Sequence, residues 1–82
     1  MSGETRSVLL FDDYAQRRRS LHSQLTASGY RVYTVGAHEA IYKLLNLYDV
    51  DIVLVEESSA GPHLEEIATN INEQSNTATQ LH

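Results

Sequence analysis

The sequence predicts an α/β protein whose sheet is parallel and carries helices on both faces. Residues 8–11 and 52–55 are wholly apolar, and each run ends on two acidic residues. Unbroken apolar runs of this length are typical of strands that are buried on both faces of a sheet. Segments with strand and helix patterns alternate along the chain, which is the order that right-handed βαβ crossovers produce.

The first strand is expected over residues 7–11 and the first helix over residues 14–28. The helical segment contains no proline or glycine, and Leu21 and Leu25 lie one turn apart. Gly29 follows at the position where a glycine commonly ends a helix. The first crossover therefore has a helical pattern and a stop signal.

Two further strand and helix pairs follow the same alternation. Residues 30–35 are rich in β-branched and aromatic side chains and predict a strand, and residues 51–55 predict another. Residues 58–62 are expected to form a loop because they include Gly61 and Pro62. Two helices are predicted by apolar residues at spacings of three and four. These residues are Ala40, Ile41, Leu44, Leu45 and Tyr48 in one helix, and Leu64, Ile67, Ala68 and Ile71 in the other, over about residues 64–72.

The last segment, residues 73–82, is mostly polar and has one large aliphatic residue, Leu81. A segment of this composition contributes little to a core, so we expect a frayed tail or a failed fourth strand. The chain of 82 residues makes one small domain without cysteines, which excludes disulfides and thiolate metal sites.

The charge and hydropathy patterns argue against nucleic acid and membrane partners. The formal net charge is -5, and the basic residues cluster only at Arg17, Arg18 and Arg19, which would be a solvated helix face. No apolar run approaches the roughly 20 residues of a membrane helix, and no apolar signal segment is present. We therefore expect a cytoplasmic protein.

In order and spacing, residues 7–71 resemble the receiver domain of bacterial response regulators. The resemblance rests on the acidic pair after the first strand, the glycine after the first helix and the acid after the third strand. The matching residues are Val8, Leu9, Leu10, Phe11, Asp12, Asp13, Arg18, Leu21, Leu25, Gly29, Tyr30, Val32, Thr34, Glu39, Ala40, Ile41, Asp51, Ile52, Val53, Leu54, Val55 and Glu56. The resemblance implies a partial flavodoxin-like fold with strand order 2-1-3, lacking the family's fourth and fifth strands and the helices that follow them.

The same resemblance implies a site at the carboxyl ends of the strands. Asp12, Asp13 and the carbonyl of Ser58 match the family's Mg²⁺ positions, and Glu56 stands where the family has its phosphate-accepting aspartate. The carboxylate of Glu56 lies about one methylene farther from the backbone, so it is misplaced for in-line attack. The hydroxyl and lysine that the family places after its last two strands have no counterpart. We expect a vestigial Mg²⁺ site and no enzyme activity.

Simpler interpretations of these acids stay open. Asp12 and Asp13 would also serve as exposed acids or helix caps. Glu56 is either a fixed negative charge that mimics phosphorylation or the result of drift. Glu57, a conceivable substitute acceptor, should point to the opposite face.

The histidines and serines do not predict a site by their spacing. His22, His38, His63 and His82 lie in different segments and are expected at the surface. Ser58 and Ser59 lie near His63 in sequence, but no strained elbow or oxyanion motif accompanies them, so hydrolase chemistry is not expected.

The leading hypothesis is a noncatalytic pseudo-receiver that acts through protein contacts in two-component or phosphorelay signalling. Its partner surface would be Arg17, Arg18 and Leu21 on the first helix, with a histidine kinase as one partner. One alternative is a Mg²⁺-dependent, phosphate-accepting receiver whose site is completed by a partner chain. Another is a remnant or fragment without an independent role.

The expected end of the sheet predicts self-association. Strand order 2-1-3 leaves the apolar third strand at an edge, and unpaired edges of this kind invite pairing. A homodimer that joins two such edges would bury them.

Overall fold

A four-stranded parallel sheet forms the centre of the molecule. The computed structural model describes residues 5–74 and 78–81. The strands are β1 (Ser7–Phe11), β2 (Arg31–Val35), β3 (Ile52–Val55) and β4 (Ala78–Leu81), in the order β2-β1-β3-β4. Leu9 of β1 pairs with Tyr33 on one side and with Val53 on the other. The predicted α/β fold and the 2-1-3 order of the first three strands are confirmed, and they are consistent with a partial flavodoxin-like fold.

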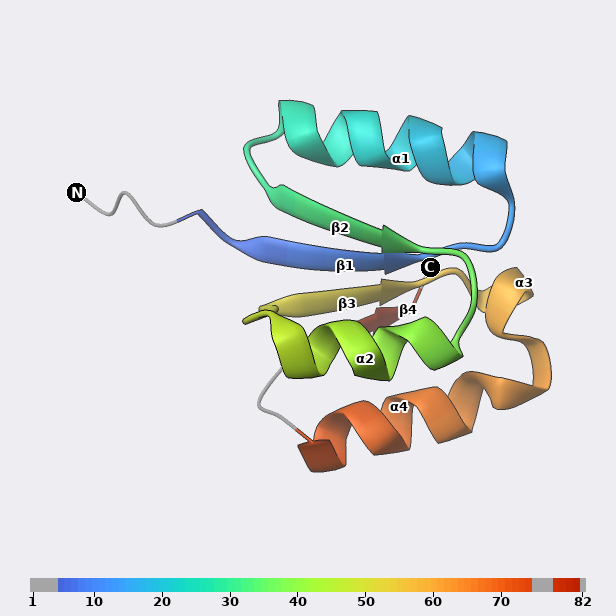
Figure 1. Ribbon diagram of the computed structural model, residues 1–82. Helices are drawn as coiled ribbons and strands as arrows, with labels where there is room; N and C mark the ends of the chain where they lie inside the picture. The colour runs from blue at the N-terminus through green and yellow to red at the C-terminus, as the bar shows by residue number, and fades with distance from the viewer. Residues whose placement is uncertain (1–4, 75–77, 82) are drawn as a thin grey trace.

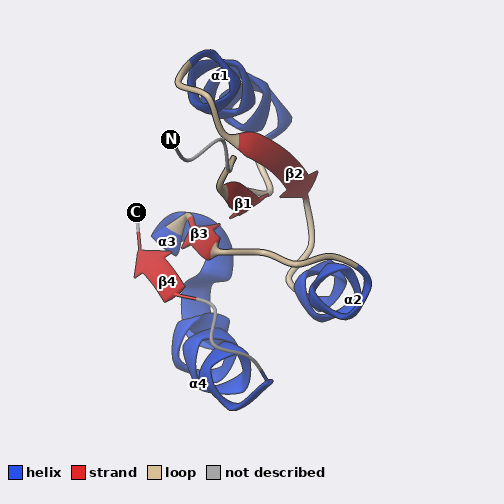
Figure 2. Ribbon diagram, turned by 90° about the vertical axis from the view of Figure 1, so that its left-hand side faces the viewer, coloured by secondary structure: helices blue, strands red, loops and turns tan. Residues whose placement is uncertain are grey.

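Helices cover both faces of this sheet. The longer ones are α1 (Ala15–Ala27), α2 (Glu39–Leu47) and α4 (Leu64–Gln74). α1 lies over β1 and β2 on one face, and α2 and α4 lie on the other (Figures 1 and 2). No helix in residues 5–74 and 78–81 is long and apolar enough to span a membrane.

The C-terminus of α1 confirms the role predicted for Gly29. Its φ is +99°, a conformation that suits glycine. The N–H of Gly29 bonds to the carbonyl of Thr26 at 3.0 Å, and the N–H of Tyr30 bonds to that of Leu25 at 3.2 Å. These two bonds form a Schellman motif, which turns the chain back toward β2.

The prediction of a loop at residues 58–62 is wrong. This segment forms the one-turn helix α3 (Glu57–Ala60) and the 3₁₀ helix η1 (Gly61–His63). The Glu56 carboxylate accepts the N–H of Ser58 and so caps α3, and Pro62 stands at the start of η1, where its missing N–H costs nothing.

The main core lies between the sheet and the α2 and α4 face. Its buried side chains are those of Leu9, Phe11, Val35, Ile41, Val50, Val53, Val55, Ala60, Ile67 and Ile71. On the other face, Val8 and Leu10 are buried, whereas Ile52 and Leu54 of β3 are only half-buried. The described helix on this face, α1, covers β1 and β2 and leaves β3 partly open (Figure 2).

The prediction that β3 forms an exposed edge of the sheet is also wrong. β4 pairs with β3 in parallel, with Val53 opposite Thr79 and Val55 opposite Leu81. The polar composition of the tail does not predict this strand. Strands pair through their backbone groups, however, and the N–H and C=O groups of β3 need partners. The premise for a homodimer through β3 is therefore removed.

Candidate functional site

The acidic residues that follow β1 and β3 meet at the carboxyl edge of the sheet, beside α3 (Figure 1). Phe11 pairs with Val55, so Asp12 and Glu56 are the next residues on two neighbouring strands. The N–H of Glu56 donates to the carbonyl of Phe11 at 3.0 Å and holds the two strand ends together. The sequence-based expectation that these acids share one site is met.

An arginine from α1 occupies the centre of this site. The side chain of Asp12 is fully buried, and its two carboxylate oxygens bind the guanidinium of Arg17. Nε lies 2.6 Å from Oδ2, and Nη2 lies 2.8 Å from Oδ1. Two parallel bonds between a guanidinium and a carboxylate are a strong and directional form of ion pair.

The start of α1 explains how Arg17 reaches Asp12. The N–H of Tyr14 donates to Asp12 Oδ1 at 2.9 Å, which fixes the turn into the helix. Arg17 then lies in the first turn of α1, and helical side chains lean toward the N-terminus of their helix. The guanidinium is thereby directed back toward the strand end.

The other acids are held by two serines of α3. The hydroxyl of Ser59 lies 2.6 Å from Asp13 Oδ1 and 3.3 Å from Asp12 Oδ1. Since a hydroxyl has one proton, we assign its hydrogen bond to Asp13, whose N–H in turn donates to Ser59 at 3.0 Å. Glu56 Oε1 accepts the hydroxyl of Ser58 at 2.9 Å, and Glu56 Oε2 lies 3.9 Å from Arg17 Nε.

The contacts of Asp12 lower its pKa below the ordinary value. Burial alone disfavours the charged carboxylate, but hydrogen bonds from Arg17 and from the Tyr14 N–H, together with the positive charge of Arg17, outweigh it. The same hydrogen bond with Asp12 raises the pKa of Arg17. Both groups are therefore charged at neutral pH.

The arrangement does not fit a Mg²⁺ ion. Mg²⁺ needs oxygen ligands in octahedral geometry at about 2.0–2.1 Å. Here the oxygens of Asp12 bind a guanidinium, and Asp13 and Glu56 accept serine hydroxyls. The four residues proposed as a vestigial metal site, Asp12, Asp13, Glu56 and Ser58, do come together, but a fixed positive side chain stands among them.

Two arginines of the α1 cluster contact the acidic site, and the third faces solvent. Arg18 Nη1 donates to the backbone carbonyl of Asp12 at 2.7 Å, so neither Arg17 nor Arg18 is purely solvated. Gly36 allows this contact, because a Cβ there would lie 2.9 Å from Arg18 Nη1. Arg19 is exposed, and Leu21 is half-buried.

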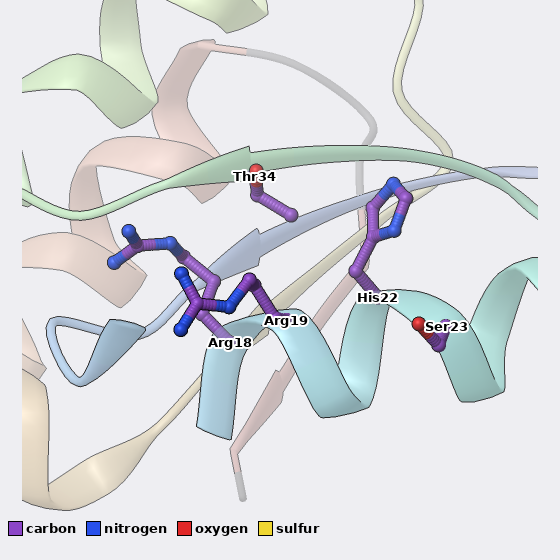
Figure 3. Close-up of a pocket in the computed structure, with 5 residues that line it drawn as sticks. All are labelled: Arg18, Arg19, His22, Ser23 and Thr34. Atoms are coloured by element: carbon purple, nitrogen blue, oxygen red, sulfur yellow. The ribbon is translucent and has the colours of Figure 1, made fainter. Parts of the chain in front are cut away.

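A shallow groove of about 330 Å³ runs between α1 and β2. Figure 3 shows its lining, with the Arg18, Arg19, His22 and Ser23 side chains on α1 and Thr34 on β2. The two guanidinium groups give this groove a positive character. It lies beside, and not within, the acidic site.

Two of the histidines, which come from separate segments, lie against each other near the surface. The rings of His38 and His63 stack with centroids 4.1 Å apart, and His63 Nδ1 lies 3.4 Å from Glu66 Oε1. His22 is exposed on α1, and His82 lies outside the described residues. The hydroxyls of Ser58 and Ser59 bond to carboxylates, which gives no support to a serine and histidine pair.

Sequence inspection missed the roles of Arg17, Ser59 and the histidine pair. The spacing of five residues between Asp12 and Arg17, across a helix start, was the available signal for the ion pair. The histidine pair had no such signal, because its members come from separate segments.

Comparison with models of known protein families gives no match, and neither does comparison with curated proteins. The resemblance to receiver domains therefore rests on the residue pattern over residues 7–71.

Proposed function

We propose that the chain is a noncatalytic receiver-like domain that acts by binding another protein in two-component or phosphorelay signalling. The observation that carries the proposal is the paired contact of Arg17 with both carboxylate oxygens of Asp12. It supports a site that has acids at the receiver positions but directs the central one at a guanidinium instead of a metal ion.

The chemical argument concerns the transferring phosphoryl group. Its catalysis relies on a metal ion and donors that neutralise charge on the phosphoryl oxygens. Arg17 contributes one positive charge, but its donors are already directed at Asp12, and Glu56 is engaged by Ser58. A site in which the carboxylates of Asp12, Asp13 and Glu56 all accept hydrogen bonds favours a single state over a switch.

The proposed contact surface is the outer face of α1 around Arg18 and Leu21. α1 has no buried residue, so its side chains all remain at least partly accessible. The groove beside it adds the positive groups of Arg18 and Arg19. This combination suits a partner helix that carries carboxylates next to an apolar stripe, since opposite charges guide such contacts.

The absence of phosphoryl transfer is tested with a small donor. The protein is incubated with acetyl phosphate and Mg²⁺, and its intact mass is measured. We expect no phosphoryl adduct on the wild type, on Glu56→Asp, or on Glu57→Gln as a control for the neighbouring acid. A Mg²⁺-dependent adduct on the wild type that is lost in Glu56→Gln would instead support a phosphate-accepting receiver.

The contact surface is tested with purified phosphotransfer domains of histidine kinases from the same source. The double variant Arg18→Glu, Leu21→Glu should weaken binding at least about tenfold in titration calorimetry. Lys43→Glu on α2 reverses one charge on the other side of the sheet and should bind like the wild type. Equal affinity of the wild type and the folded double variant would contradict the α1 surface.

A further inference from the structure

A second group of potential ligands lies on the opposite side of the carboxyl edge from α1. His38 ends the connection from β2 to α2, His63 belongs to η1, and Glu66 lies in the first turn of α4. One donor atom from each of these three side chains lies within 4.8 Å of the other two. Among the described residues, this is the group that brings together two imidazoles and a carboxylate.

We propose that His38, His63 and Glu66 bind a divalent transition-metal ion, with Zn²⁺ as the best match. Two imidazole nitrogens and one carboxylate oxygen form a donor set that Zn²⁺ uses where three protein ligands leave a fourth position to water. Imidazole ligands favour Zn²⁺, Ni²⁺ and Cu²⁺ over Mg²⁺ and Ca²⁺, which prefer oxygen.

The distances are compatible with this ion once the His38 ring turns out of its stack on His63. Zn²⁺ bonds of about 2.0–2.2 Å in tetrahedral geometry place neighbouring donors roughly 3.3 Å apart. His63 Nδ1 and Glu66 Oε1 are already 3.4 Å apart. The His38 ring stacks on that of His63 with centroids 4.1 Å apart and an interplanar angle of 21°. The metal must lie in the plane of each ring, so the His38 side chain has to turn out of this stack to bring its nitrogen to the same point.

The surroundings also favour a cation. His38 Nδ1 lies 3.7 Å from Glu39 Oε1, which leaves Nε2 for the metal and provides a carboxylate that orients the ring. Glu65 and Glu66 add negative charge in the first turn of α4. Acids at these positions also suit the helix N-termini, so the imidazole pair is what distinguishes a metal site from ordinary helix capping.

The side chains of all three proposed ligands are accessible to solvent, so a metal ion can reach them. The side chain of His38 is 21% exposed, that of His63 is 46% exposed, and that of Glu66 is 56% exposed. Metal entry therefore needs no opening of the core. A bound ion would tie the connection between β2 and α2 to the start of α4.

The test uses the full chain after removal of metals by a chelator. Zn²⁺ is titrated by calorimetry, and Co²⁺ is added separately as a spectroscopic probe of ligand geometry. We expect one Zn²⁺ per chain and Co²⁺ absorption typical of four-coordinate sites. His38→Ala and His63→Ala should each weaken Zn²⁺ binding by more than the 10- to 100-fold that loss of an outer ligand partner costs.

Two control variants make the result specific. His22→Ala and His82→Ala should bind Zn²⁺ like the wild type. Glu66→Gln keeps the shape of the third proposed ligand while removing its charge, and it should weaken Zn²⁺ binding. Circular dichroism of each metal-free variant checks that it is folded. The proposal is overturned if the wild type takes up no Zn²⁺ in a saturable way, or if the affinity follows His22 or His82 and is unchanged in His38→Ala and His63→Ala.

Discussion

Arg17 Nε lies 2.6 Å from Oδ2 of the fully buried Asp12, at the point where β1 meets α1. The contact joins a strand end to the first turn of a helix that has no buried residue of its own. We therefore regard this ion pair as an anchor of α1. It also occupies the carboxylate oxygens that a metal ion would need. Two predictions test these roles, and two more concern Ser59 and β4.

Removing Arg17 should destabilise the fold. Arg17→Ala leaves the carboxylate of Asp12 buried without its cation, which costs far more than loss of an exposed ion pair. We expect the Tm to fall by at least about 5 °C in thermal unfolding monitored by circular dichroism. Arg19→Ala, on the exposed side of α1, should leave the Tm nearly unchanged. Equal Tm values for both variants would refute the anchor role.

The stability of the protein should fall in acid because of Asp12. Its pKa is lower in the folded state than in the unfolded chain, so the ionised carboxylate contributes stability that is fully present above the unfolded value of about 4. This contribution is lost as the pH falls through the folded pKa. Urea midpoints measured between about pH 5.5 and 2.5 should decline less steeply for Asp12→Asn than for the wild type. Parallel curves would show that other carboxylates dominate the acid response.

Ser59 should matter more than its neighbour Ser58. The Ser59 hydroxyl connects α3 to Asp13 through two hydrogen bonds. The exposed Ser58 bonds within its own turn to Glu56 and accepts a longer bond, of 3.4 Å, from Arg17 Nη2. Ser59→Ala should lower the free energy of unfolding by about 1 kcal/mol in urea titrations, and Ser58→Ala by less. The reverse order would mean that the bridge to Asp13 contributes little.

Removing β4 should expose the apolar edge of β3. A chain that ends at residue 77 leaves the ladder groups of β3 without the partners seen at Val53 and Val55. We expect this variant to self-associate more strongly than the full chain in light scattering after gel filtration. A chain that lacks only His82 serves as the control. If the two shortened chains have the same mass and Tm, β4 does not protect the edge.

The sequence by itself determined the alternation of strands and helices, and it placed the acids at the strand ends. Apolar runs and helical periodicity are local patterns, so they predicted the segments around β1, α1, β2, α2, β3 and α4. The cap at Gly29 was equally local. The order of the first three strands followed from the resemblance to receiver domains. In parallel strands, neighbouring carboxyl ends share an edge, which is why Asp12 and Glu56 could be expected together.

Only the tertiary structure decided how these segments use their polar groups. β4 forms from a polar tail because the open ladder of β3 supplies its partner, a reason that the tail's own composition does not contain. The Arg17 side chain points inward because the buried carboxylate of Asp12 lies next to the first turn of α1. His38 and His63 meet because α2 and α4 start at the same edge of the sheet. Each of these outcomes depends on contacts between residues distant in space or sequence, where hydrogen bonding and desolvation outweigh local preference.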